Sequence, residues 1–589
     1  MKSFFKYLLA SVVGVMVAMV IIFFIFMGII SVMIASTDRT TVIRPNTLLH
    51  LELDKTVYDR SSKDPFDSFD PFSMSLRSSL GLNEILENIN KAKEDENIDG
   101  IFLEISIPSA GIATLGEIRE ALEDFRESGK FIIASSDLYS QPAYYLASIA
   151  DKVYLTPSGG IAFQGLRTEI MFFKNALDRL GIDPQIVRHG EFKSAVEPFM
   201  QDRMSPENRE QIMTYISSIW EHMLEKISES RGIDVTRLNA YASGLTIRND
   251  QRALEYGFVD GLKYRHEVIN ELKELTGIEE DEDLKTVSLP KYANVPGKRE
   301  FKRFPSDKVA VVYAQGTINV GEGGQQMIGS DKISRALREA RLDKNVKAIV
   351  FRVNSGGGSA LASEVIWREV KEAAKEKVVI ASMGDLAASG GYYIVAAADK
   401  IVAHPQTLTG SIGVFGMLPN TGQFFEEKLG ITFDVAKTNE HADLGSIFRP
   451  MTPTEREFIR DGIEDIYRLF VERVSEGRGM EESMVNEIAQ GRVWSGANAL
   501  EIGLIDEFGG MERAIEIAIE DAGLEEYRIV SLPVLKDPFE RIMDQFTSGI
   551  RERIIRKELG ESFRYYDMLQ QVMQMEGVQA RLPFEITVY

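Results

Sequence analysis

The chain of 589 residues contains no cysteine and only six histidines. Without cysteine, disulfides and thiolate chemistry are excluded, although this absence assigns no cellular compartment. With so few histidines, a serine nucleophile would need one of these six rings or a different type of base. No histidine lies in a pattern typical of a catalytic triad, but His404 and His441 stay open for the role. We expect no metal and no other cofactor.

The chain also lacks an excess of positive charge, since its net charge is −22. Nucleic-acid-binding proteins usually carry a basic face, so nucleic acid is not an expected partner. A hydrophobic content of 44% and a charged content of 26% are ordinary for a folded globular protein. At this length the chain is too large for a single core, and two to four domains are expected.

Long apolar runs are absent except for one. Residues 8–35 carry no charge over 28 positions. A helix of that length exceeds the roughly 30 Å hydrocarbon core of a bilayer, whereas a cleavable signal peptide has an apolar region of only about 7 to 15 residues. We therefore predict a cytoplasmic N-terminus and a retained transmembrane helix within residues 1–46. Basic residues flank the run on both sides, so the positive-inside rule favours this orientation only weakly.

The remainder of the chain reads as two copies of one domain. "SDLYSQPAYYLASIADK" at 136–152 matches "GDLAASGGYYIVAAADK" at 384–400, and "MSPENRE" at 204–210 matches "MTPTERE" at 451–457. The offset between matching segments stays between 246 and 249 residues over some 200 positions. Such a constant register indicates a tandem duplication.

We predict a first repeat at 47–285, a linker rich in proline and charge at 286–306 and a second repeat at 307–535. A helical C-terminal extension at 536–589 falls outside the duplication, and we assign it no chemistry.

Within each repeat, short β-branched runs alternate with amphipathic helical patterns. In the second repeat the runs "KVAVVYAQG", "VKAIVFRV", "KVVIASM" and "KIVAHP" predict buried strands, with helical patterns between them. This alternation indicates βαβ units with a largely parallel sheet, and therefore an α/β fold. A long helix is predicted to begin after Thr452, with proline next and glutamate at the third position.

A glycine-rich loop, "VNSGGGSAL" at 353–361, follows one of the predicted strands. Successive glycines expose backbone N–H groups, which suit a phosphate or the oxyanion of an acyl-transfer intermediate. No lysine follows as in a Walker loop, and the Gly-x-Gly-x-x-Gly pattern is absent. A plain tight turn is equally open. The first repeat has "ISIPSAGIA" at 105–113, without three glycines.

Ser389 precedes a predicted helix and is followed by Gly390. It could be a nucleophile next to an unshielded amide, or it could simply cap the helix, which is a common role for serine. The first repeat has Ser140 as a candidate cap nearby, without the flanking glycines. The comparison favours a cap in the first repeat and a functional serine in the second.

A lysine can act as the base if burial lowers its pKa. Lys193 lies in "HGEFKSAVEPF" at 189–199, among small and apolar neighbours. The second repeat has "NEHADLGSIF" at 439–448, with alanine near position 442. The repeat with the lysine lacks the serine, and the repeat with the serine lacks the lysine. This complementary loss raises the expectation that both residues are functional.

Five motifs together give the chain a specific resemblance to a known family: "VNSGGGS", "GDLAASGGYYIVAAADKIVA", "TGSIGV", "KSAVEPF" and "GRVWSGANALEIGLID". The sequence resembles the long, duplicated form of signal peptide peptidase A, a family of membrane-anchored bacterial serine proteases. The resemblance covers nearly the whole chain. One departure is Gly356, where the family often has proline, and it leaves the amide of the next glycine unaffected.

The resemblance implies a Ser–Lys dyad divided between the repeats. Ser389 would be the nucleophile, Lys193 the general base, and the amides of Gly357 and Gly390 the oxyanion hole. Ser194, next to the lysine, is a candidate for orienting its amine, and a solvated helix-cap role for Ser194 is equally open. Whether the dyad forms within one chain or between two chains is not decided by the sequence.

The resemblance also implies two tandem domains with the fold of the Clp protease subunit and crotonases, assembled as a homotetramer open towards the membrane. The substrates would be hydrophobic signal peptides left in the bilayer. The location would be the bacterial inner membrane, with a single span and the repeats on the periplasmic side. Two alternatives are a crotonase-like acyl-CoA enzyme, disfavoured because no basic cluster lies near 353–361, and a non-catalytic membrane scaffold.

Overall fold

The computed structural model describes residues 4, 6–7, 10–11, 13–19, 21, 43–60, 69–70, 75–76, 79–296, 305–324, 327–534 and 578–582. The anchor predicted at 8–35 lies largely outside these residues. Within them, no helix combines the length and the apolar character that crossing a bilayer requires.

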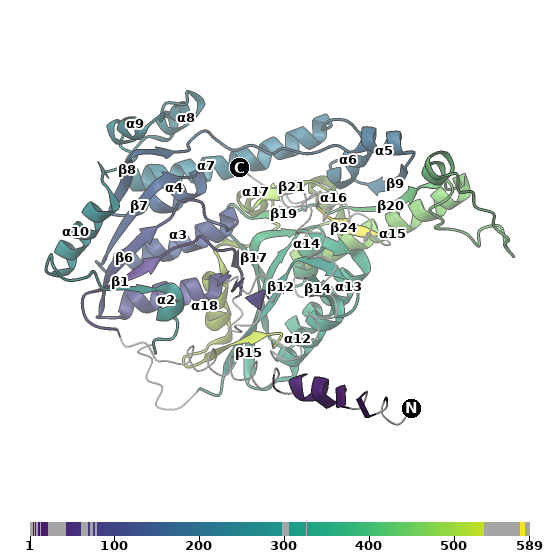
Figure 1. The fold of residues 1–589 in the computed structure, drawn as a ribbon. Helices are drawn as coiled ribbons and strands as arrows, with labels where there is room; N and C mark the ends of the chain where they lie inside the picture. The colour runs from purple at the N-terminus through teal and green to yellow at the C-terminus, as the bar shows by residue number, and fades with distance from the viewer. Residues whose placement is uncertain are drawn as a thin grey trace.

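The first repeat is built on a parallel six-stranded sheet (Figure 1). Its strand order is β10 (Gly261–Leu262), β8 (Lys152–Ile161), β7 (Phe131–Tyr139), β6 (Ile98–Glu104), β1 (Thr47–Leu51) and β11 (Thr286–Ser288). Every neighbouring pair is parallel, as expected for strands that are joined by helices.

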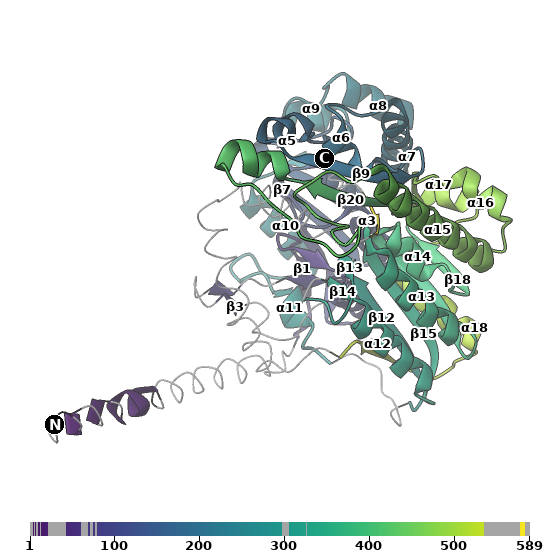
Figure 2. The ribbon, with the colours of Figure 1, turned by 90° about the vertical axis from the view of Figure 1, so that its right-hand side faces the viewer.

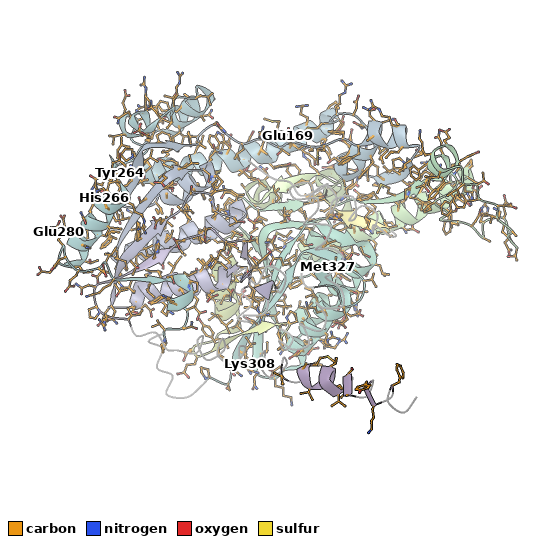
Figure 3. All side chains as sticks on the ribbon, viewed as in Figure 1. Glu169, Tyr264, His266, Glu280, Lys308 and Met327 are labelled. Atoms are coloured by element: carbon orange, nitrogen blue, oxygen red, sulfur yellow. The ribbon has the colours of Figure 1, made fainter. Side chains whose placement is uncertain are left out.

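The second repeat has a corresponding sheet. Its order is β21 (Val493–Ser495), β19 (Leu408–Gly410), β17 (Val378–Ala388), β15 (Val346–Ser355), β12 (Lys308–Gln315) and β23 (Arg528–Leu532), with β18 (Lys400–Ala403) and β22 (Glu507–Phe508) continuing from β17. The strands predicted in this repeat are confirmed. Lys308 at the start of β12 and Met327 in β14 (Met327–Gly329) are labelled in Figure 3.

Helices cover both faces of each sheet, which explains the nearly continuous burial of the strands. In the second repeat, α12 (Ser330–Leu342) and α13 (Ala360–Ala374) pack on one face and α18 (Met511–Ala522) on the other. In the first repeat, α2 (Leu82–Glu94) and α3 (Ile112–Glu127) oppose α10 (Arg265–Thr276). The duplicated α/β architecture predicted from the sequence is therefore present.

Each repeat also contains a helix of 26 residues, α7 (Pro206–Arg231) and α15 (Pro453–Arg478). Thr452 caps α15 in a capping box with Glu455, as predicted, and Ser205 caps α7. Both helices end at a left-handed glycine. In Figure 1, α7 extends from the first sheet over the second repeat.

A third sheet joins the two repeats. Its order is β14, β13 (Thr317–Asn319), β16 (Gly357–Ser359), β24 (Gln579–Arg581), β20 (Val414–Asn420) and β9 (Asp183–His189). Strand β9 of the first repeat pairs with β20 of the second over seven antiparallel positions. Figure 2 shows β9 and β20 side by side above the second repeat. This sheet carries a segment of the first repeat into the second.

Two predicted boundaries differ from the structure. The linker predicted at 286–306 begins with β11 and α11 (Leu289–Tyr292), which pack on the first repeat because β11 extends its sheet beside β1. The predicted helical extension at 536–589 lies outside the described residues except for 578–582, which contain strand β24 (Gln579–Arg581). The strand forms there because β16 and β20 offer backbone partners on both sides.

A buried ionic cluster also connects the repeats. The guanidinium of Arg352 on β15 lies 2.8 Å from Asp59 and 2.7 Å from Glu117, both in the first repeat. All three side chains are buried. Because an unpaired buried charge is strongly destabilising, the cluster fixes the relative placement of the two repeats.

Candidate active site

Ser389 occupies a strained turn between β17 and α14 (Gly390–Val395). Its φ of 55° and ψ of −117° are unfavourable for a residue with a side chain. Although it stands at the N-cap position, its side chain makes no capping hydrogen bond. Ser140, which caps the corresponding helix α4 (Gln141–Ala147) of the first repeat, has a φ of −63° and accepts a hydrogen bond from the N–H of Ala143. The capping interpretation therefore holds for Ser140 and not for Ser389.

Lys193 of the first repeat lies directly against this serine. Its Nζ lies within hydrogen-bond distance of Ser389 Oγ, at 2.8 Å, and of Ser411 Oγ and O, at 3.1 and 3.2 Å. Lys193 follows β9 by four residues and Ser411 precedes β20 by three, so the β9–β20 pairing brings them together. The two predicted residues meet within a single chain.

The lysine amine is held in an environment that favours its neutral form. Lys193 and Ser389 are both 0% exposed. The acceptors around Nζ are two hydroxyls and a carbonyl, none of which carries a charge. Burial therefore holds the pKa of the Lys193 amine well below its usual range. A neutral amine has a lone pair with which it can accept the serine proton.

Glycines of the second repeat make room for the lysine. Gly491 has a φ of +79°, and a Cβ built on it would lie 2.7 Å from the N, Cα and Cβ atoms of Lys193. A Cβ on Gly413 would lie 3.3 Å from Lys193 Cδ. Both glycines thus leave space for Lys193, which comes from the other repeat.

Ser194 does not orient the amine. Its Oγ accepts a hydrogen bond from Gln211 Nε2 at 2.9 Å, and Ser411 takes the position beside Nζ. Ser194 is buried, so the solvated cap is also wrong. It starts the short 3₁₀ turn η1 (Ser194–Val196), whose geometry turns its side chain towards α7.

Gln211 of α7 connects this loop to the second repeat. Its amide nitrogen donates to the Phe192 carbonyl at 3.1 Å as well as to Ser194. Its Oε1 accepts the Val493 N–H of β21 at 3.0 Å. Gln211 therefore ties the segment that carries Lys193 to a strand of the other sheet.

Gly357 and Gly390 lie next to each other beside Ser389. Gly357 has a φ of +96°, and a Cβ built on it would lie 2.7 Å from the amide nitrogen of Gly390. The Gly357 N–H donates to Ser355 Oγ at 3.1 Å. An oxyanion would be a stronger acceptor than this neutral hydroxyl, because charge-assisted hydrogen bonds are stronger than neutral ones.

The two histidines left open as bases interact elsewhere. His404 is buried and lies 3.5 Å from Glu120, with Nδ1 accepting the Gln406 N–H. His441 lies 3.4 Å from Glu455. Among the described residues, Ser389 Oγ lies within hydrogen-bond distance of Lys193 Nζ and, at 3.4 Å, of the Gly413 carbonyl. Neither histidine is hydrogen-bonded to this hydroxyl in the described part of the chain.

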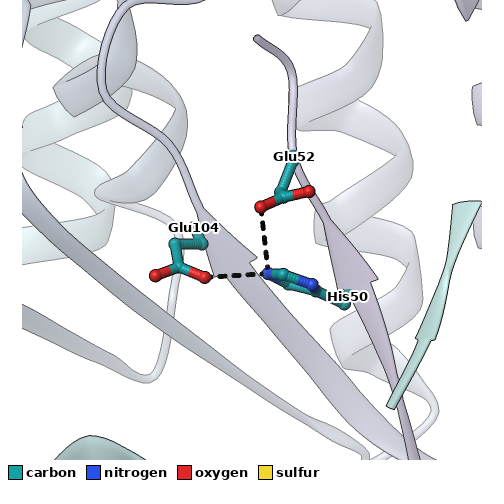
Figure 4. A group of neighbouring side chains, drawn as sticks. All are labelled: His50, Glu52 and Glu104. Atoms are coloured by element: carbon teal, nitrogen blue, oxygen red, sulfur yellow. Dashed lines mark hydrogen bonds and ion pairs between the residues drawn. The ribbon is translucent and has the colours of Figure 1, made fainter. Parts of the chain in front are cut away.

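A second cluster has the composition of a metal site. His50 Nε2 lies 3.0 Å from Glu104 Oε2 and 3.7 Å from Glu52 Oε1 (Figure 4). However, Arg265 donates to both oxygens of Glu104, at 2.6 and 3.0 Å. The hydrogen bonds and charges of His50 and Arg265 lower the pKa of Glu104 to about 2 despite its partial burial. The cluster is satisfied as a surface ion-pair network.

Sequence reasoning missed Ser411, Gly491 and Gln211. Ser411 and Gly491 lie in the motifs "TGSIGV" and "GRVWSGANALEIGLID", so their signal was present. Gln211 lies on the buried face of a long helix, and nothing local distinguishes it. Its contacts depend on two segments that are distant in the sequence.

Comparison with known proteins gives a consistent assignment. The profile of peptidase family S49 matches twice, at residues 124–279 and 371–525. "Protease 4" of Haemophilus influenzae is 37% identical over 74% of this chain and 72% of its own length. "Serine protease SPPA, chloroplastic" of Arabidopsis thaliana is 34% identical over 87% of this chain and 76% of its own.

Among solved structures, a point mutant of ClpP1 from Listeria monocytogenes is 17% identical, with a TM-score of 0.24, over 35% of this chain and 94% of that chain. The double match to the family and the relatives that cover most of the chain give one conclusion. The chain belongs to peptidase family S49 and is a serine protease of that family.

Proposed function

We propose that this serine protease cleaves hydrophobic signal peptides, with Ser389 as nucleophile and Lys193 as general base. The observation that carries the proposal is the 2.8 Å contact between Lys193 Nζ and Ser389 Oγ in a fully buried site. A serine on a strained turn, a desolvated amine and adjacent glycine amides are the parts that acyl transfer requires.

In the first step, Ser389 Oγ attacks the carbonyl carbon of the peptide bond while its proton passes to neutral Lys193. The amides of Gly357 and Gly390 hold the resulting oxyanion, and each such donor is typically worth about 3–4 kcal/mol. The C–N bond then breaks, and the Lys193 ammonium returns the proton to the leaving amine. This leaves an acyl-enzyme and a neutral lysine.

In the second step, water attacks the acyl-enzyme and Lys193 takes its proton. The collapse of the intermediate returns that proton to Ser389 Oγ and releases the new carboxyl group. Ser411 keeps Nζ beside Oγ through both steps, because its hydroxyl and its carbonyl both hydrogen-bond to the amine.

The proposal also includes a location at a membrane. A single span at residues 8–35 would hold the two repeats at the periplasmic face of a bacterial inner membrane, where cleaved signal peptides accumulate. Each repeat would have the type of fold found in the Clp protease subunit and crotonases. Neither alternative function fits as well: the relatives are proteases, and Ser389 is not a helix cap.

We further propose that copies of the chain assemble head to tail into a closed tetramer. The duplication supports this, because 167–173 corresponds to β20, and 432–438 corresponds to β9. Both segments are described, and the structure assigns no strand to either of them. Phe433 and Val435 are 43% and 53% exposed. Pairing 432–438 with 167–173 of the next copy repeats the internal contact and closes a ring.

The assembly can be tested by mass photometry. Phe433→Asp with Val435→Asp should convert tetramers to smaller species, whereas Val320→Asp, at a residue that is 62% exposed, should not. Unchanged tetramers in the double variant would contradict the proposed pairing.

The catalytic proposal is tested with the full-length protein in detergent, a hydrophobic signal peptide and mass spectrometry. Ser389→Ala should lower the hydrolysis rate by at least about 10³-fold. The matched control is Ser140→Ala in the first repeat, which should retain the rate and lose only about 1 kcal/mol of stability. Equal rates for wild type and Ser389→Ala would refute the assignment.

A further inference from the structure

Strand β24 fills a slot between the two strands that flank the candidate nucleophile. It pairs antiparallel with β16, with Gly358 opposite Ala580, and it also pairs with β20 through Phe415 and Gln579. At its ends, the Ala360 N–H donates to the Val578 carbonyl at 3.2 Å, and the Leu582 N–H donates to the Gly356 carbonyl at 2.7 Å. The segment 578–582 is thus held as an extended peptide by the backbone on both sides.

The carbonyl of Ala580 lies against the two glycines whose amides form the proposed oxyanion hole. A Cβ built on Gly357 would lie 2.1 Å from this oxygen, and one built on Gly390 would lie 3.0 Å from it. The side chains on either side are enclosed, because Ala580 is fully buried and Leu582 is 5% exposed. The Ala580 carbonyl, and with it the bond from Ala580 to Arg581, therefore lies beside the proposed oxyanion hole.

With β24 in place, Ser389 and Lys193 have no exposed surface. A protease of this kind would bind its substrate as an added strand, since backbone hydrogen bonds give affinity without depending on sequence. The backbone groups available for that strand on β16 and β20 are the ones that β24 already uses. An external peptide and β24 cannot occupy the slot together.

We propose that residues 578–582 are an intramolecular ligand of the substrate groove and must leave before a peptide substrate can bind. In this register Ala580 stands immediately before the scissile position and Leu582 is the second residue after it. The groove would thus select extended peptides with a small residue before the cleaved bond and an apolar residue two positions beyond. This inference rests on the proposed function for the identity of the nucleophile, but not for the occupancy of the groove.

The test uses the full-length chain and a fluorescein-labelled nonapeptide with the sequence of residues 576–584, EGVQARLPF. Binding is followed by fluorescence anisotropy in Ser389→Ala protein, so that no cleavage intervenes. Adding Ala580→Trp should tighten binding at least about tenfold, because the indole cannot enter the fully buried position and the segment no longer competes at its high effective concentration. Leu582→Asp should also tighten binding of the nonapeptide. It provides an independent variant in case Ala580→Trp fails to fold.

The matched control is Val534→Trp, which adds the same bulk at a residue that is 73% exposed and should leave the Kd unchanged. The proposal would be overturned if adding Ala580→Trp or Leu582→Asp, each separately, to the Ser389→Ala protein left the Kd for the nonapeptide unchanged. A nonapeptide with tryptophan in place of its alanine should bind at least about tenfold more weakly. If it binds as well as the parent peptide, the proposed register is wrong.

A parallel assay separates this proposal from the catalytic one. With Ser389 intact, Ala580→Trp should lower the KM for the nonapeptide while kcat is retained. If Ala580→Trp tightens binding in the Ser389→Ala protein but the nonapeptide is never hydrolysed, the groove assignment stands and the catalytic role of Ser389 fails.

Discussion

At the scale of single residues, the proposed site depends on a buried lysine whose pKa is lowered by desolvation. Lys193 has only neutral acceptors around Nζ and no exposed surface. Desolvation therefore stabilises the neutral amine, which is the form that can act as a base. That Lys193 and Ser389 belong together could be predicted from the sequence, because each is present in only one repeat and both lie in motifs of the family resemblance. Ser411 also lies in such a motif, but its contact with Lys193 could not be predicted because it joins the two repeats.

The lowered pKa predicts the pH dependence of the reaction. The protonated amine cannot accept the serine proton, so kcat/KM should rise with pH through the folded-state pKa of Lys193 and then level off. Because burial lowers that pKa, the plateau should be reached below the ordinary range of lysine. The measurement is a pH–rate profile with the nonapeptide or a signal peptide.

Lys193→Arg is the control for this profile, because arginine stays protonated and should be inactive throughout. A wild-type rate that falls as pH rises through neutrality, or that rises only in the ordinary lysine range, would contradict a desolvated lysine base.

At the scale of secondary-structure elements, the contact between Lys193 and Ser389 depends on the seven-position pairing of β9 with β20. The strands of each repeat and helix α15 could be predicted from apolar periodicity and capping residues. The third sheet could not be predicted, because its strands come from the first repeat, the second repeat and the C-terminal segment. Strand β24 has only three residues and owes its conformation to β16 and β20, so local pattern did not reveal it.

The turn at Gly491 gives a prediction at this scale. Gly491→Ala places a methyl group 2.7 Å from the backbone of Lys193, which must displace the lysine. We expect kcat to fall by about 10²-fold, because small misplacements of reacting groups have effects of that size. Steady-state kinetics would measure the change.

Gly479→Ala is the matched control. Gly479 also has a positive φ, of 62°, but a Cβ there would meet nothing within 4 Å. It should carry the backbone cost of about 1–2 kcal/mol without loss of kcat. Equal kcat values for the two variants would contradict the idea that Gly491 makes room for Lys193.

At the scale of the whole molecule, the two repeats share one proposed site, and neither is complete alone. The β9–β20 pairing and the Arg352 cluster hold the repeats in one arrangement. The duplication and the α/β class could be predicted from the constant offset and from the alternation of strands and helices. The sequence alone could not predict whether Lys193 and Ser389 meet within one chain or between two chains, because the repeat pattern does not show which repeats lie side by side.

The intrachain contact makes a prediction about mixed assemblies. Co-assembly of Lys193→Ala with Ser389→Ala subunits should restore no activity, because each chain would lack one member of its own dyad. Hydrolysis of a signal peptide by co-expressed and co-purified variants measures this. Recovery of a substantial part of wild-type activity would instead mean that lysine and serine come from different chains.

The central claim is that Ser389 is a nucleophile activated by Lys193. The most direct measurement is covalent labelling of the full-length protein with diisopropyl fluorophosphate, with the adduct located by peptide mass spectrometry. We predict that the adduct forms on Ser389 in the wild type and is nearly absent from Lys193→Ala treated for the same time. An adduct on another residue, or equal labelling of Ser389 without the lysine, would contradict the account.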